Sequence, residues 1–292
     1  MVASRKEKLC YYLYLVPAFS VFIVFIFWPT VRSFYLSLCE YKITTINSAA
    51  KFVGLQNYIK LFSDDYFWIV MKNTAVYTFF TVPVSIAAGL GLALLIHSKL
   101  VVHKTFYKVV YYIPYVSAMV AVASVFAILF MPGSQGVINQ FLAKFGIDPV
   151  PFLSHNGWAM AAVIILSVWK ELGYIMIIYL GGLLSISEDV YEAVSLDPIS
   201  PWQRLTRITL PLLKPTTLFL FVTQMIGCFQ VFTPVNIMTS GGPGYATTTL
   251  VTTLYNYGFK DFQMGKASAI AVVIFVILSV MTVIQNAVAG DD

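Results

Sequence analysis

Long apolar runs with few charged side chains recur along the sequence, separated by shorter polar segments. A helix rises about 1.5 Å per residue, so about 20 mostly apolar residues cross a hydrocarbon core roughly 30 Å thick. Runs of this kind predict membrane-spanning helices at about residues 11–34, 73–97, 107–130, 158–184, 215–236 and 267–287. The pattern therefore predicts an all-α membrane protein with about six spans, forming a single transmembrane domain over residues 1–292.

The first apolar run follows Arg5, Lys6 and Lys8, as the apolar part of a secretory signal would. It is too long for such a signal and ends in the bulky Phe27-Trp28-Pro29 without a small-residue cleavage site. We therefore expect a retained first span.

Composition supports a lipid environment. Apolar residues make up 59% of the chain and charged residues 11%, against about 25% charged in soluble domains. The net charge of +5 is scattered, without the basic block that would indicate nucleic acid binding. Neither Cys10, Cys39 and Cys228 nor the widely separated histidines have the spacing of a metal site or a disulfide framework. The sequence also contains no Gly-x-x-x-x-Gly-Lys-Ser/Thr loop that could bind ATP phosphates, and no evident catalytic constellation.

Lysine and arginine are densest in the segments before the first span, between the second and third, and between the fourth and fifth. Because cytoplasmic loops are rich in these residues, both termini are expected in the cytoplasm. The long inner loop is then residues 185–214, which reads as two short amphipathic helices around a turn. Ser200-Pro201-Trp202-Gln203 has the spacing of a capping box with Pro at the first helical position. Such a pair either lies on lipid headgroups or docks on a partner protein.

This loop resembles the EAA motif of binding-protein-dependent ABC importer permeases. The resemblance rests on Tyr191-Glu192-Ala193, Asp197, Ile208-Thr209-Leu210-Pro211 and Pro215. Val194 departs from the usual Ala, and Pro198-Ile199 from the usual Gly-Ala. Since Pro cannot supply the positive φ that Gly permits, the turn differs locally or a helix begins with Asp197 as its N-cap.

Other stretches are similar to the sugar-type branch of the same family. These are Tyr112-Ile113-Pro114, Trp169-Lys170 with Gly173, Phe232 with Thr239–Pro243, and Phe262–Ser268. The resemblance implies a type I importer permease that binds no cofactor itself and lies in a bacterial or archaeal cytoplasmic membrane. It implies as partners a second permease, two ATP-binding subunits, an extracytoplasmic solute-binding protein and a carbohydrate, specifically an oligosaccharide, with a sugar phosphate or polyol as alternative. It assigns coupling to the ATPase to Tyr191, Glu192, Ala193, Asp197, Pro198 and Trp202.

The candidate solute pathway comes from polar residues inside the predicted spans. Lys170 and Glu171 lie midway along the fourth span, where exposure to lipid is costly. Adjacent helical residues point about 100° apart, so one or both should face a polar cavity or a partner helix. The pair either lines the pathway or has a purely structural role.

In the fifth predicted span, Thr223, Gly227 and Gln230 follow an i, i+4, i+7 row with Gln224 beside it. The row either lines a route for a hydroxylated solute or packs helices through hydrogen bonds. Further candidates for contact with a sugar are Tyr174, Phe229 and Asn236.

Two other functions would fit a polytopic chain. A gradient-driven secondary transporter could use Lys170 and Glu171 as an ion relay, but it would predict an inverted repeat and matching broken helices, which the sequence does not show. A scaffold subunit would have no solute path. Reconstituted uptake that requires ATP and a partner ATPase would distinguish the importer from both.

Overall fold

The computed structural model describes residues 5–43, 49–98, 100–195 and 199–289. Internal contacts divide the chain into two units. The first unit joins Met1–Asp65 to Thr253–Val276, and the second joins Tyr66–Thr252 to Ile277–Asp292.

The first unit combines the N-terminal helices with the first half of the last helix. Its elements are α1 (Arg5–Phe22), the π-helical η1 (Ile23–Phe27), α2 (Trp28–Ser37), β1 (Cys39–Glu40), β2 (Lys51–Phe52), α3 (Gln56–Phe62), the π-helical η4 (Asn256–Lys260) and α15 (Met264–Ala289) as far as residue 276. β1 and β2 pair antiparallel. The Asn57 side chain donates hydrogen bonds to the carbonyls of Ser37 at 2.8 Å and Cys39 at 2.9 Å, which ties α3 to the end of α2.

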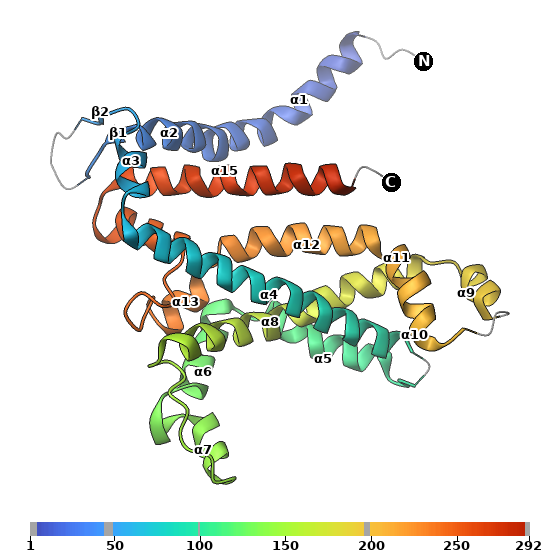
Figure 1. The fold of residues 1–292 in the computed structure, drawn as a ribbon. Coiled ribbons are helices and arrows are strands. Elements are labelled where there is room, and N and C mark those ends of the chain that lie inside the picture. The colour runs from blue at the N-terminus through green and yellow to red at the C-terminus, as the bar shows by residue number, and fades with distance from the viewer. Residues whose placement is uncertain (1–4, 44–48, 99, 196–198, 290–292) are drawn as a thin grey trace. The chain divides into compact units, whose positions relative to one another are not determined.

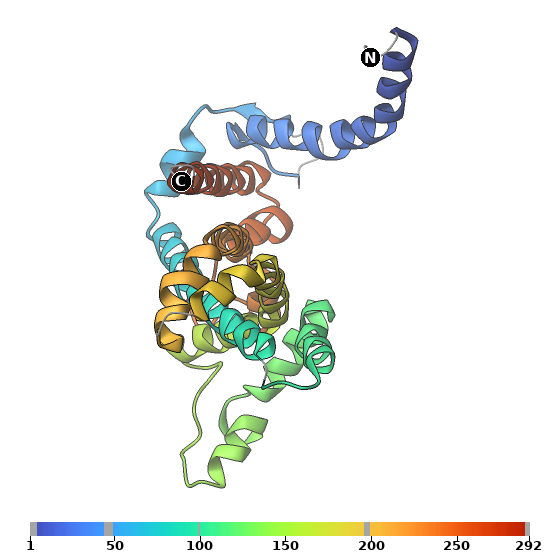
Figure 2. The same ribbon diagram turned by 90° about the vertical axis from the view of Figure 1, so that its right-hand side faces the viewer.

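The second unit contains the longest helices and the inner loop. Its elements are α4 (Asp65–His97), α5 (Lys104–Val116), α6 (Met119–Leu129), η2 (Gly133–Gln135), α7 (Val137–Ala143), α8 (Asn156–Ser185), α9 (Glu188–Ser195), α10 (Pro201–Arg204), the π-helical η3 (Leu205–Thr209), α11 (Leu210–Leu212), α12 (Lys214–Phe229), α13 (Thr233–Met238), α14 (Leu250–Tyr255) as far as residue 252, and α15 from residue 277. Within this unit α9 and α10 lie at one end of α8, and α6, α7 and α13 lie at the other (Figure 1). Figure 2 shows the segment that carries α7 projecting from the unit's long helices.

Four described helices are long and apolar enough to cross a membrane. They are Tyr14–Ser37, Asp65–His97, Asn156–Ser185 and Met264–Gln285. Two bent pairs meet the same criterion, α5 with α6 at 93° and Pro201–Leu212 with α12 at 67°, so counting each pair as one span gives six. The predicted all-α membrane fold is confirmed.

The bent and interrupted helices differ from the simplest interpretation of the apolar runs. The run predicted as one span over 107–130 is divided where Ser117 and Ala118 take extended conformations between α5 and α6. The run over 215–236 is also interrupted, since α12 ends at Phe229 and α13 begins at Thr233. Pro114 lies in the last turn of α5 and lacks the N–H that would continue the helical ladder. An apolar run of this length therefore indicates that the segment lies in the membrane, but it does not require one continuous helix.

Lys170 of α8 fills the hydrogen-bonding gap at the α5–α6 break. Its Nζ donates to the carbonyl oxygens of Pro114 at 3.0 Å, Tyr115 at 2.8 Å and Ser117 at 2.8 Å. These carbonyls belong to the C-terminal end of α5, where the helix dipole favours a cation. An ammonium has three N–H donors, so this contact uses all of them.

Small residues let the long helices of the second unit approach closely. A Cβ atom at Gly173 would overlap the backbone of Tyr111 and Tyr112, so α8 and α5 touch there through main chain. Gly89 of α4 likewise packs on Ile175 of α8. Lipid tails are as apolar as the helix surfaces, so the hydrophobic effect does not drive helices together within a membrane. Close van der Waals packing between small residues stabilises the helix pairs instead.

We predict that Gly173→Ala destabilises the second unit, because the added methyl group forces α5 away from α8 and overpacking costs about 1–3 kcal/mol. Gly181→Ala is the matched control on the same helix, since its Cβ would meet nothing within 4 Å. Thermal unfolding of the purified protein in detergent measures the effect. Equal unfolding temperatures for the two variants would show that the α5–α8 contact tolerates separation.

We also predict that Lys170→Met changes the angle between α5 and α6, because it leaves three half-buried carbonyls without this donor, and a buried carbonyl left unpaired costs about 1–3 kcal/mol. Lys170→Arg should keep more of the bend, since guanidinium also donates several hydrogen bonds. Spin labels at Val109 and Val125, which are 54% exposed on α5 and α6, report the distance between the two helices. Lys144→Met removes an exposed charge elsewhere and should leave that distance unchanged. An unchanged distance in Lys170→Met would mean that the break holds its own geometry.

Candidate functional site

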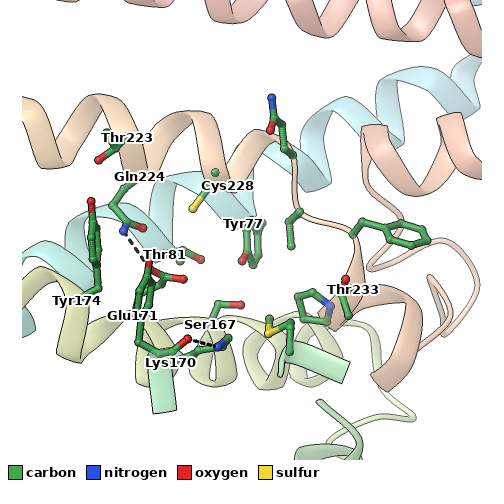
Figure 3. A pocket seen from close by; sticks show the side chains of 17 residues that line it. Tyr77, Thr81, Ser167, Lys170, Glu171, Tyr174, Thr223, Gln224, Cys228 and Thr233 are labelled. Atoms are coloured by element: carbon green, nitrogen blue, oxygen red, sulfur yellow. Dashed lines mark hydrogen bonds between the residues drawn. The ribbon is translucent and has the colours of Figure 1, made fainter. Parts of the chain in front are cut away.

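A polar cavity of about 410 Å³ lies among the long helices of the second unit (Figure 3). This volume falls in the range of about 300–1,000 Å³ that is typical of small-molecule sites. The lining residues come from α4, α5, α6, α8, α12 and the segment into α13: Tyr77, Thr81, Tyr115, Met119, Ser167, Lys170, Glu171, Tyr174, Thr223, Gln224, Gly227, Cys228, Gln230, Val231, Phe232, Thr233 and Pro234.

One face of α8 supplies the charged part of the cavity. Ser167, Lys170, Glu171 and Tyr174 follow an i, i+3, i+4, i+7 spacing, which places them on one side of a helix. Lys170 is 8% exposed and reaches the α5–α6 break. Glu171 is half-buried and extends instead toward α12. The two adjacent side chains thus serve different neighbours.

The opposite wall comes from α12 and its C-terminal end. Gln224 is buried, and its Nε2 donates to Glu171 Oε2 at a long 3.4 Å. Thr223 donates its hydroxyl to the backbone of its own helix, at 2.9 Å to Phe219 and 3.1 Å to Leu220. Gly227 is open, since a Cβ there would meet nothing within 4 Å.

Stacked aromatic rings form a third part of the lining. Tyr115 of α5 stacks on Tyr174 of α8 with ring centroids 4.8 Å apart and an interplanar angle of 16°. Lys170 Nζ lies 5.8 Å from the Tyr115 ring centroid. The cavity therefore combines an apolar ring surface with hydroxyl, amide and carboxylate groups, as sites for polar small molecules do.

The structure brings together the pathway residues predicted from sequence, except Phe229 and Asn236. Those at the cavity are Lys170, Glu171, Tyr174, Thr223, Gln224, Gly227 and Gln230. Gln230 lies at the C-cap of α12, beyond the helical row that suggested it. Asn236 lies on α13 and is absent from the described lining. A solute role for these residues stays a prediction.

Sequence reasoning missed the cavity's α4 wall. Tyr77 and Thr81 are buried and line the cavity. Thr81 Oγ1 is also buried without a hydrogen-bond partner among the described residues. The available signal was a row of polar residues at helical spacing in an apolar span, Thr74, Thr78, Thr81 and Ser85.

The inner loop contains the second candidate site. The predicted capping box is confirmed, because the Ser200 hydroxyl accepts from the Gln203 N–H at 3.2 Å and the Gln203 side chain accepts from the Ser200 N–H at 2.9 Å. The Arg204 guanidinium lies 4.5 Å from the Tyr191 ring centroid, a cation–π contact that holds α9 against α10. Glu192 is exposed and Trp202 is 71% exposed. The loop thus presents an acidic and an aromatic side chain on a braced helix pair.

Three predicted coupling residues cannot be placed in this way. Asp197 and Pro198 lie outside the described residues, and so does the side chain of Ala193, whose backbone belongs to α9. Within the described part of the chain no group of three or more His, Cys, Asp or Glu side chains could hold a metal ion.

Comparison with known proteins relates both sites to one family. Residues 85–290 match the model of the binding-protein-dependent transport system inner membrane component. The chain is 34% identical over 284 residues to the probable ABC transporter permease protein YurN of Bacillus subtilis, covering 96% of each. It is 33% identical to the lactose transport system permease protein LacF of Rhizobium radiobacter, covering 97% of this chain and 95% of LacF. It is also 32% identical to the sn-glycerol-3-phosphate transport system permease protein UgpA of Escherichia coli, covering 94% and 92%.

A solved structure agrees with this relationship. A chain of a bacterial ABC transporter involved in the import of the acidic polysaccharide alginate superposes with a TM-score of 0.83 at 26% identity, covering 97% of this chain and 96% of that one. The prediction of a multi-pass inner-membrane permease is confirmed. The chain therefore belongs to the family of binding-protein-dependent transport system inner membrane components, and it is an ABC transporter permease.

Proposed function

We propose that the chain forms, with a second permease subunit, the pathway for an oligosaccharide delivered by an extracytoplasmic binding protein. Two ATP-binding subunits supply the energy. The observation that carries this proposal is the 410 Å³ cavity, which joins stacked tyrosines to amide, hydroxyl and carboxylate groups deep in a membrane protein. Sugars present both apolar ring faces and hydroxyl groups, so this lining matches both kinds of surface.

The relatives support a carbohydrate solute but differ in its charge. They include a lactose permease, a glycerol-3-phosphate permease and an importer of the acidic polysaccharide alginate. A sugar phosphate or a polyol is therefore the alternative to an oligosaccharide. The cavity volume of about 410 Å³ favours an oligosaccharide, because it is larger than a three-carbon solute needs.

Coupling to the ATPase is assigned to the inner loop. Glu192 and Trp202 project from α9 and α10, which the contact between Tyr191 and Arg204 braces as one element. Aromatic residues and desolvated charges are frequent anchors at protein interfaces. A docked ATPase could therefore move this element as a rigid piece.

We predict that Gly227→Leu lowers uptake while the complex still assembles, because the side chain occupies open space in the cavity. The control is Gly181→Leu, a matched change on α8 at a glycine that is exposed, open and outside the cavity lining. The measurement is ATP-dependent uptake of radiolabelled neutral di- and trisaccharides by reconstituted vesicles. Uptake by Gly227→Leu equal to that of Gly181→Leu would count against a solute path through this cavity.

We predict that Glu192→Lys weakens ATPase docking or uncouples hydrolysis from uptake, yet leaves membrane insertion intact. An exposed ion pair contributes about 0–1 kcal/mol, whereas reversing a charge desolvated in an interface costs several times as much. Co-purification of the ATPase and vesicle uptake measure the two effects, with Asp148→Lys as a charge reversal at another exposed site. If docking and uptake both survive, α9 lies on the membrane surface instead.

A further inference from the structure

Two side chains with opposite charge line the cavity, and the structure uses them differently. The Lys170 ammonium donates to three backbone carbonyls at 2.8–3.0 Å, which accounts for all of its N–H groups. It is 8% exposed and lies against the C-terminal end of α5. A solute in the cavity therefore meets no available N–H from this cation.

Glu171 differs in both exposure and pairing. It is half-buried, and the contact that the structure gives its side chain is the long 3.4 Å hydrogen bond from Gln224. A carboxylate has about four lone-pair positions, so this one hydrogen bond uses a small part of its accepting capacity, and Glu171 belongs to the cavity lining. Figure 3 shows Glu171 directed toward Gln224, while Lys170 extends away from Gln224, and its ammonium binds the carbonyls at the α5–α6 break.

The rest of the lining supplies no other cation that could bind an anionic solute. Besides Lys170 no Lys, Arg or His belongs to the cavity lining among the described residues. Phosphate and carboxylate groups are usually bound by Arg or Lys side chains or by free backbone N–H groups. Hydroxyl groups, in contrast, donate strong hydrogen bonds to a carboxylate.

We propose that Glu171 determines specificity by accepting hydrogen bonds from solute hydroxyl groups and by repelling phosphate and carboxylate groups. This inference rests on the proposed solute role of the cavity. It narrows the substrate to an uncharged polyhydroxylated carbohydrate and excludes sugar phosphates and acidic saccharides. Lys170 supports this selection indirectly, since its engagement with the α5–α6 break leaves the carboxylate as the charge that a solute meets.

The repulsion can be measured without knowing the solute. Gly227 belongs to the cavity wall formed by α12, and a Cβ there would meet nothing within 4 Å. Gly227→Cys therefore introduces a thiol at the cavity, in a chain whose Cys10, Cys39 and Cys228 have been replaced by Ser. The assembled complex is treated with a cationic reagent, trimethylammonioethyl methanethiosulfonate, or with an anionic one, sulfonatoethyl methanethiosulfonate. Each rate is divided by the rate of the same reagent with a free thiol in solution.

The introduced thiol should react at least about tenfold faster with the cation than with the anion, because a nearby carboxylate concentrates cations and repels anions. Adding Glu171→Gln should remove most of this preference, since glutamine keeps the size and loses the charge. Glu40→Gln makes the same change in the other unit and should leave the ratio unaltered.

The outcomes separate this inference from the proposed function. Equal rates, a faster anion, or a preference that survives Glu171→Gln would overturn the specificity role and leave the solute path intact. Failure of both reagents to reach the thiol in every nucleotide state would show that Gly227 faces no aqueous cavity, which overturns both proposals.

Discussion

The carbonyl groups at the α5–α6 break must be paired inside the protein, because hydrocarbon supplies no water to bind them. Lys170 meets this requirement from α8, and its contacts link a charge in one span to the backbone of another. The same bend carries Tyr115 and Met119 to the cavity wall. The position of that wall therefore depends on one buried ammonium.

Close packing makes the contact possible, because a lysine side chain has a limited reach. Gly173 lies one helical turn beyond Lys170 on α8, and it touches α5 at Tyr111 and Tyr112, just before the carbonyls that Lys170 binds. The glycine therefore sets the distance between the two helices, and the lysine then fixes the bend. Neither residue would fix the bend alone. Without Gly173 the wider gap would leave the carbonyls unpaired, and without Lys170 the unpaired break would have no fixed angle.

Local patterns predicted much of this molecule. The apolar runs indicated the membrane fold, and Ser200 with Gln203 indicated a capping box, since both features depend on nearby residues. The division of the 107–130 run was not predicted, because the partner that stabilises it lies 53 to 56 residues away. Thr81 was missed for a similar reason, as a hydroxyl in an apolar helix usually bonds its own backbone, and its place in the cavity depends on tertiary packing.

The proposed coupling has a direct mechanical route, because α8 and α12 flank the inner loop and also line the cavity. α8 has 30 residues, a length of about 45 Å as a helix. Near the loop, Gly182 packs against Leu213 and Thr216, which ties the end of α8 to the start of α12. A displacement of α9 and α10 would therefore move both helices together. At the cavity the two helices are held less tightly, because the contact between them there is the long hydrogen bond between Gln224 and Glu171. Movement that begins at the loop would thus change the cavity first at this weak contact, beside the carboxylate that we propose contacts the solute.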